Sequence, residues 1–60
     1  MARILVIEDE ADLRKVLEKA LQSAGHTVTT AADGHEGMKS YRASPTDLVV
    51  TDLFMPNQDG

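Results

Sequence analysis

A short apolar run that ends at once in acidic residues is the feature that most limits how this chain can fold. Residues 4–7 read ILVI, and Glu8 and Asp9 follow directly. Unbroken apolar runs of this length are typical of parallel strands buried on both faces, whereas half-exposed strands alternate apolar and polar residues. A second run, residues 48–51 (LVVT), ends at Asp52. We therefore expect two buried parallel strands that each lead into carboxylates.

The first stretch between these runs predicts a helix and a third strand. In residues 13–24, apolar residues recur at steps of three and four, with Arg14 and other charged residues on the opposite side. Asp12 in the first turn and Gly25 after the last turn suit the two ends of this amphipathic helix. Residues 26–31 are rich in β-branched side chains but more polar than residues 4–7, which predicts an edge strand.

A second helix is expected after the edge strand. Asp33 followed by Glu36 resembles a capping box with Asp in place of Ser or Thr. The helix that it opens is expected to bury Met38 and Tyr41. Gly37 should weaken this helix by about 1 kcal/mol relative to alanine.

The order of these elements indicates the start of an α/β doubly wound parallel sheet with right-handed crossovers. With the polar strand at one edge, the spatial strand order is 2-1-3. In such sheets ligands bind beyond the carboxyl ends of the strands, at the point where the winding reverses between strands one and three. Glu8, Asp9 and Asp52 all fall at that point.

These three acids predict a magnesium site. Carboxylates gathered at neighbouring strand ends repel one another unless a cation lies among them, and Mg²⁺ prefers hard oxygen ligands. A carboxylate can also attack phosphorus, in a reaction that depends on positioning and on cancelling negative charge. Any one of the acids could instead form a turn or cap a helix. Their joint position favours a metal site in which Asp52 accepts a phosphoryl group.

Composition and charge exclude several other classes of protein. The chain has 60 residues, 42% of them hydrophobic, which is enough for one small domain at most. The absence of cysteine rules out disulfides and thiolate zinc sites. A net charge of −4 with scattered Lys and Arg argues against direct nucleic-acid binding. The first apolar run is too short for a signal peptide or membrane span, so we expect a cytoplasmic chain. His26 and His35 are expected to be ordinary surface or strand-edge residues.

Four segments of the chain resemble successive landmarks of the response-regulator receiver domain. They are residues 4–10 (ILVIEDE), 33–37 (DGHEG), 45–52 (PTDLVVTD) and 55–60 (MPNQDG). The acidic pair, the Asp that ends a strand and the last segment make this a specific match over the whole length. The resemblance implies a flavodoxin-like fold.

The resemblance also implies a role for each candidate site residue. Asp52 would be the phosphoacceptor, Glu8 and Asp9 the metal-binding acids, and the backbone carbonyl of Phe54 a further ligand of Mg²⁺. The expected phosphoryl donor is a sensor histidine kinase, and the domain would be a signalling module, not an enzyme. Glu8 stands where Asp is more frequent, so its longer side chain could reach Mg²⁺ directly. Gly37 stands where alanine is common, which we expect to cost stability rather than activity.

By this resemblance, residues 1–60 form only the first half of a receiver domain. The Ser or Thr after strand four, the Lys after strand five and the switch aromatic are missing, so we expect site geometry with little or no turnover. Residues 48–51 would become a free edge, which predicts a homodimer formed along that strand or by exchange of elements. Binding to a separate missing half is the competing explanation.

Two alternatives to a phosphorylatable receiver follow from the same residues. One is a self-associating half-domain, structural or engineered, without signalling activity. The other is a nucleotide or flavin binder, which is disfavoured because no glycine-rich turn follows residues 4–7.

Overall fold

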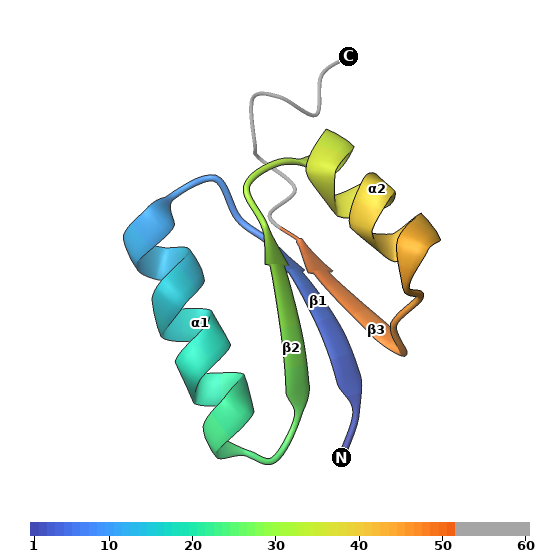
Figure 1. Cartoon of the computed structure of the whole chain (residues 1–60). Coiled ribbons are helices and arrows are strands. Elements are labelled where there is room, and N and C mark those ends of the chain that lie inside the picture. The colour runs from blue at the N-terminus through green and yellow to red at the C-terminus, as the bar shows by residue number, and fades with distance from the viewer. Residues whose placement is uncertain (52–60) are drawn as a thin grey trace.

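The computed structural model describes residues 1–51, which form a three-stranded parallel sheet with two helices (Figure 1). The elements are β1 (Arg3–Ile7), α1 (Ala11–Ser23), β2 (Thr27–Ala31), α2 (Gly34–Ala43) and β3 (Leu48–Thr51). The strands lie in the order β2-β1-β3. The expected α/β class, element order, strand order and edge position of β2 are therefore confirmed.

The central strand β1 pairs with β2 on one side and with β3 on the other, both in parallel. Residues that face each other across parallel strands share a face of the sheet, so Leu5, Ile7 and Ala31 lie on one face, where they form the buried core cluster. Val6 and its partner Thr30 lie on the opposite face. All four apolar residues of β1 from Ile4 onward are at most 6% exposed, which confirms the prediction of a strand buried on both faces.

The two helices account for this burial because each covers one face. Gly37 of α2 approaches the side chains of Ile7 and Ala31, whereas a pocket between α1 and β2 is lined by Thr30 from the other face. Figure 1 shows the helices on either side of the sheet. Neither of these helices, within residues 1–51, has the length and apolarity that crossing a bilayer requires.

The predicted end of α1 and start of α2 are confirmed by hydrogen bonds. Gly25 adopts the left-handed conformation, with φ at 95°. Its N–H donates to the carbonyl of Gln22 at 2.9 Å, and the N–H of His26 donates to the carbonyl of Leu21 at 3.1 Å, which together make a Schellman motif. At the start of α2, the Asp33 carboxylate accepts the N–H of Glu36 at 2.8 Å, so Asp33 is the expected cap.

Burial in α2 differs from the prediction. Met38 and Tyr41 were expected in the core, but they are 51% and 36% exposed. The helix residue that is buried is Gly37. A Cβ atom at Gly37 would lie 2.7 Å from Cγ1 of Ile7, so the lack of a side chain lets α2 approach the sheet closely. The helix therefore packs on the sheet through its glycine, and its larger apolar side chains stay exposed.

The prediction that β3 is buried is wrong for the described residues. Leu48 and Val49 are 55% and 44% exposed. Both helices pack mainly on β1 and β2, and residues 1–51 supply no strand on the outer side of β3. Within residues 1–51, the apolar strand β3 is thus paired with β1 alone.

Candidate functional site

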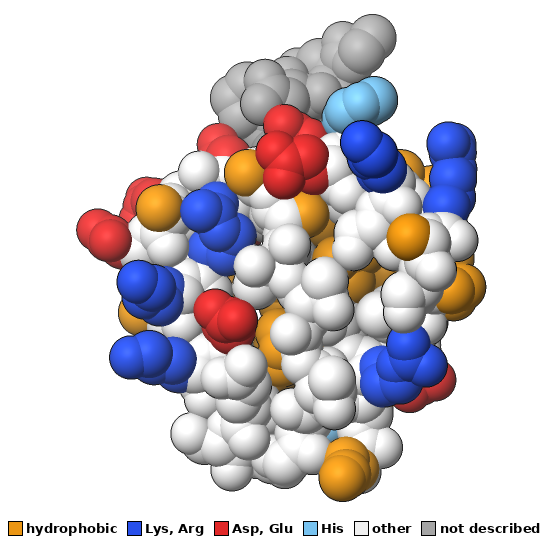
Figure 2. All heavy atoms as spheres, in the orientation of Figure 1, with side chains coloured by type: hydrophobic (Ala, Val, Ile, Leu, Met, Phe, Trp, Pro, Cys, Tyr) orange, Lys and Arg blue, Asp and Glu red, His pale blue; other side chains and the backbone are white. Residues whose placement is uncertain are grey.

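The acidic pair Glu8 and Asp9 directly follows β1, at the carboxyl end of the sheet. Glu8 is 5% exposed, whereas Asp9 is exposed. Figure 2 shows some acidic side chains at the end of the molecule where the strands of Figure 1 finish, and others over α1. Asp52 and Phe54, the other predicted site residues, lie outside the described residues. The structure therefore describes half of the predicted site.

Three hydrogen bonds fix Glu8. Its N–H donates to the carbonyl of Ala31 at 3.0 Å, which continues the pairing with β2. Its carboxylate Oε2 accepts the N–H of Glu10 at 3.1 Å. Its carbonyl accepts a hydrogen bond from the guanidinium of Arg14 at 2.9 Å. A buried polar group without partners is costly, and here the backbone and carboxylate of Glu8 are both engaged.

Arg14 is the residue that sequence reasoning missed, because periodicity assigns it only to the polar side of α1. The helix begins at Ala11, so Arg14 lies in its first turn. Helical side chains lean towards the N-terminus of their helix, which brings the guanidinium back to the turn after β1. Its place in the first turn was the available signal, but the bond to the Glu8 carbonyl depends on how α1 packs.

The side chains present fit a magnesium site by the chemistry of their donors. Glu8 and Asp9 offer carboxylate oxygens, which are the hard ligands that Mg²⁺ prefers. Within residues 1–51, no group of three or more His, Cys, Asp or Glu side chains converges. Two of the three predicted acids belong to that part of the chain.

The two histidines lie away from the acidic pair in the sequence and differ in environment. Nδ1 of His26 accepts the N–H of Ala2 at 3.0 Å, which ties the start of β1 to the residue before β2. His35 is exposed at the start of α2. Both agree with the expectation of surface and strand-edge residues.

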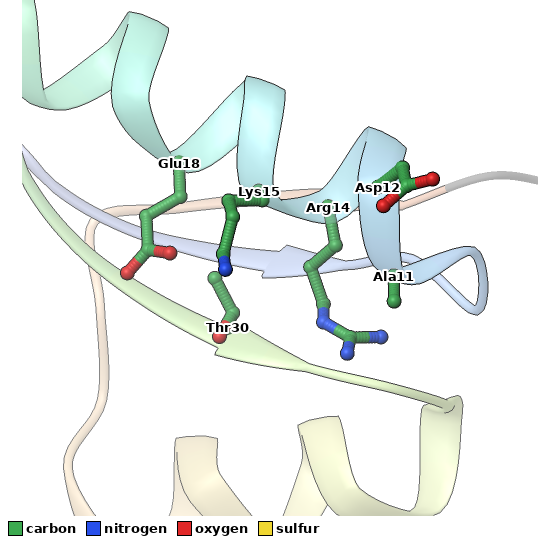
Figure 3. Close-up of a pocket in the computed structure, with 6 residues that line it drawn as sticks. All are labelled: Ala11, Asp12, Arg14, Lys15, Glu18 and Thr30. Atoms are coloured by element: carbon green, nitrogen blue, oxygen red, sulfur yellow. The ribbon is translucent and has the colours of Figure 1, made fainter.

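A polar pocket of about 310 Å³ lies between α1 and β2, next to the turn that carries the acidic pair. It is lined by Ala11, Asp12, Arg14, Lys15, Glu18 and Thr30. Figure 3 shows Arg14, Lys15 and Glu18 extending from the helix towards the strand that carries Thr30. Two acidic and two basic side chains line it, so the pocket does not favour one sign of ligand charge.

Known protein families and individual proteins both include matches to this chain. A family model described as "Response regulator receiver domain" matches residues 4–60. The probable transcriptional regulator ycf27 of Porphyridium aerugineum is 47% identical over 58 residues, which are 97% of this chain and 24% of that protein. The response regulator receiver protein CpdR of Brucella abortus is 42% identical over 60 residues, covering 100% of this chain and 50% of that protein.

Solved structures show the same similarity. The chemotaxis response regulator CheY4 of Vibrio cholerae superimposes with a TM-score of 0.88 at 36% identity, over 93% of this chain and 47% of the other. The chain therefore spans from about a quarter to half of the length of these proteins. The two helices and three strands of residues 1–51 correspond to part of that larger fold.

Proposed function

The chain belongs to the response regulator receiver domain family, and we propose that its carboxyl-end acids form a magnesium-dependent phosphoacceptor site. Response regulators of this family are signalling modules that sensor histidine kinases phosphorylate and that bind Mg²⁺ for that purpose. In this proposal Asp52 accepts the phosphoryl group. Glu8, Asp9, Asp52 and the backbone carbonyl of Phe54 hold the metal. The location that goes with this role is the cytoplasm.

The strand register is the single observation that carries the proposal. The last paired residues of β1 and β3 are Ile7 and Thr51. Glu8 and Asp52 are the next residues in the sequence. The proposal extends the register by one residue, so that Asp52 would stand beside the fixed and buried Glu8. Three acids would then meet where doubly wound sheets bind their ligands.

Each residue has a distinct part in the proposed reaction. A carboxylate oxygen of Asp52 forms a bond to phosphorus while the bond from phosphorus to the donor breaks, and the leaving group takes up a proton. When bound, Mg²⁺ supplies positive charge against the phosphoryl oxygens. Glu8 and Asp9 hold that charge in place, and the hydrogen bonds of Glu8 keep its carboxylate oriented before the donor arrives.

We further propose that residues 1–60 are the first half of a receiver domain, with little or no turnover by themselves. This is supported by the share of CheY4 that the chain covers, 47%. The Ser or Thr and the Lys that the family resemblance calls for do not occur at matching positions in these residues. In a whole receiver domain the Lys would supply positive charge and the Ser or Thr a hydrogen bond, and both would help to stabilise the transferred group.

Intact mass measured after incubation with acetyl phosphate and MgCl₂ tests the phosphoacceptor role. Over long incubation we expect a slow gain of one phosphoryl group, which is absent in Asp52→Ala and strongly reduced in Asp9→Asn. Asp12→Asn is the matched control, since Asp12 is an exposed acid in the first turn of α1 and should leave the adduct unchanged. An adduct that survives Asp52→Ala would contradict the proposal, whereas no adduct in the unaltered chain at any MgCl₂ concentration would favour a half-domain without signalling activity.

A second candidate is a self-associating half-domain. Leu48 and Val49 are apolar, exposed, and carried by a strand that pairs only with β1 among residues 1–51. Such an edge favours pairing with another strand, and a homodimer joined along β3 is the simplest closed arrangement. Analytical ultracentrifugation should then show a dimer with and without MgCl₂. A folded monomer at micromolar concentration would rule this out.

A further inference from the structure

We infer that Arg14 is a positioning residue for the acidic site, an inference that rests on the proposed magnesium-binding role of Glu8 and Asp9. The hydrogen bond that places Arg14 does not go to the carboxylate of either acid. Its guanidinium instead donates to the backbone carbonyl of Glu8 at 2.9 Å. The residue therefore acts on the backbone that presents the two carboxylates.

The turn after β1 shows how this bond would work. The Glu8 carbonyl belongs to the planar peptide unit that leads into Asp9, so the bond from Arg14 fixes the plane before Asp9. The peptide after Asp9 is fixed as well, because the N–H of Glu10 donates to Oε2 of Glu8 at 3.1 Å. Asp9 is exposed and makes no contribution to the core, yet the peptide units on both sides of it are held. The backbone at Asp9, and with it the direction of its Cα–Cβ bond, is thereby set in advance.

Arg14 is in turn held by the helix that bears it. Its own N–H donates to the carbonyl of Glu10 at 2.9 Å, which is the first helical bond of α1. The side chain is only half-exposed and lines the pocket between α1 and β2. Figure 3 shows it extending from the helix beside Lys15. The arginine thus links the start of α1 to the backbone of the acidic turn.

The charge of Arg14 and its hydrogen bond have opposite expected effects on metal binding. A positive charge near a cation site repels the cation, so its removal by itself should strengthen Mg²⁺ binding slightly. Loss of the hydrogen bond should weaken it, because outer groups that orient metal ligands are typically worth about 10- to 100-fold in affinity. The sign of the change therefore distinguishes positioning from simple electrostatics.

Magnesium titration of the 60-residue chain, followed by NMR chemical shifts, provides the test. Arg14→Gln should weaken Mg²⁺ binding by about tenfold. Lys15→Gln is the matched control, because it removes the same charge from the adjacent residue, which lines the same pocket. It should leave affinity unchanged or slightly higher. Amide hydrogen exchange at Asp9 and Glu10 in the absence of Mg²⁺ should rise in Arg14→Gln and not in Lys15→Gln.

The outcomes separate this inference from the function on which it rests. If the unaltered chain does not bind Mg²⁺, the proposed metal site fails and this inference fails with it. If it binds, and Arg14→Gln matches Lys15→Gln, the metal site stands and the positioning role is wrong. A lower melting temperature of Arg14→Gln with unchanged Mg²⁺ affinity would likewise reduce Arg14 to a purely structural residue.

A conservative exchange keeps the test decisive if Arg14→Gln does not fold. Arg14→Lys keeps the charge and the helix propensity, but offers a single shorter donor in place of the planar guanidinium. We expect a loss of affinity smaller than tenfold, while Lys15→Arg should have no effect. Equal Mg²⁺ affinity of Arg14→Lys and the unaltered chain would overturn the inference.

Discussion

The strands β1 and β3 have similar apolar sequences and lie side by side, but their environments differ. Leu5 and Val49 are partners in the register, and their side chains are 1% and 44% exposed. β1 has a strand on each side and a helix on each face, whereas β3 has β1 as its one strand neighbour among residues 1–51. Burial of a strand is thus a property of its neighbours as much as of its sequence.

The largest expected difference between the strands comes from the same substitution at paired positions. Val6 is fully buried, and its partner Val50 is half-exposed. Val6→Ala deletes two buried methyl groups and leaves a cavity, which should lower the free energy of unfolding by about 2–3 kcal/mol. Val50→Ala should lower it by about 1 kcal/mol or less. Urea titration followed by circular dichroism measures both, and equal losses would contradict the comparison.

A smaller effect on the free energy of unfolding is expected where α2 packs against β1. Gly37→Ala should gain about 1 kcal/mol of helix propensity but bring a methyl group against Ile7, and such overpacking typically costs about 1–3 kcal/mol. We expect a net loss of about 1 kcal/mol in urea titration.

A double-mutant cycle checks the cause of that loss. Ile7→Val removes the Cδ1 atom that approaches Gly37, so Gly37→Ala should cost less in that background. Strict additivity of the two changes would show that the contact between α2 and β1 is not the reason.

The alignment of the start of β3 with β1 should depend on the side chain of Asp47 more than on packing. The carboxylate of Asp47 accepts the N–H of Arg3 at 2.9 Å at an exposed position. Asp47→Ala should therefore cost about 0.5–1.5 kcal/mol and speed amide exchange at Arg3. Asp47→Asn keeps an acceptor and serves as the control. Unchanged exchange at Arg3 in Asp47→Ala would show that the backbone ladder alone aligns β3.

The smallest effect on stability is expected on the exposed part of β3. Val49→Lys should change the free energy of unfolding by no more than about 0.5 kcal/mol, because Val49 is 44% exposed. A charge on an edge strand opposes pairing with other strands, so self-association measured by ultracentrifugation should fall. His35→Lys adds a charge at an exposed position of α2 and should leave association unchanged. A large loss of stability in Val49→Lys would mean that β3 is better covered than its exposure indicates.

Much of the candidate site was predictable because it depends on local sequence and strand polarity. Glu8 and Asp9 had to lie at the carboxyl end of the sheet once residues 4–7 formed a parallel strand. Arg14 was not predictable, since its bond to the Glu8 carbonyl requires the position of α1 relative to the turn. Asp52 and Phe54 stay predictions.

The sequence by itself determined the elements, their order and the ends of the helices. Periodicity, the cap at Asp33 and the left-handed Gly25 act over a few residues, so no distant contact is needed to specify them. Only the tertiary structure decided which apolar residues are buried. The apolar residues of β1 are buried, while Leu48, Val49 and Met38 remain exposed. Hydrophobicity favours burial, but a side chain is buried only where another strand or helix packs against it.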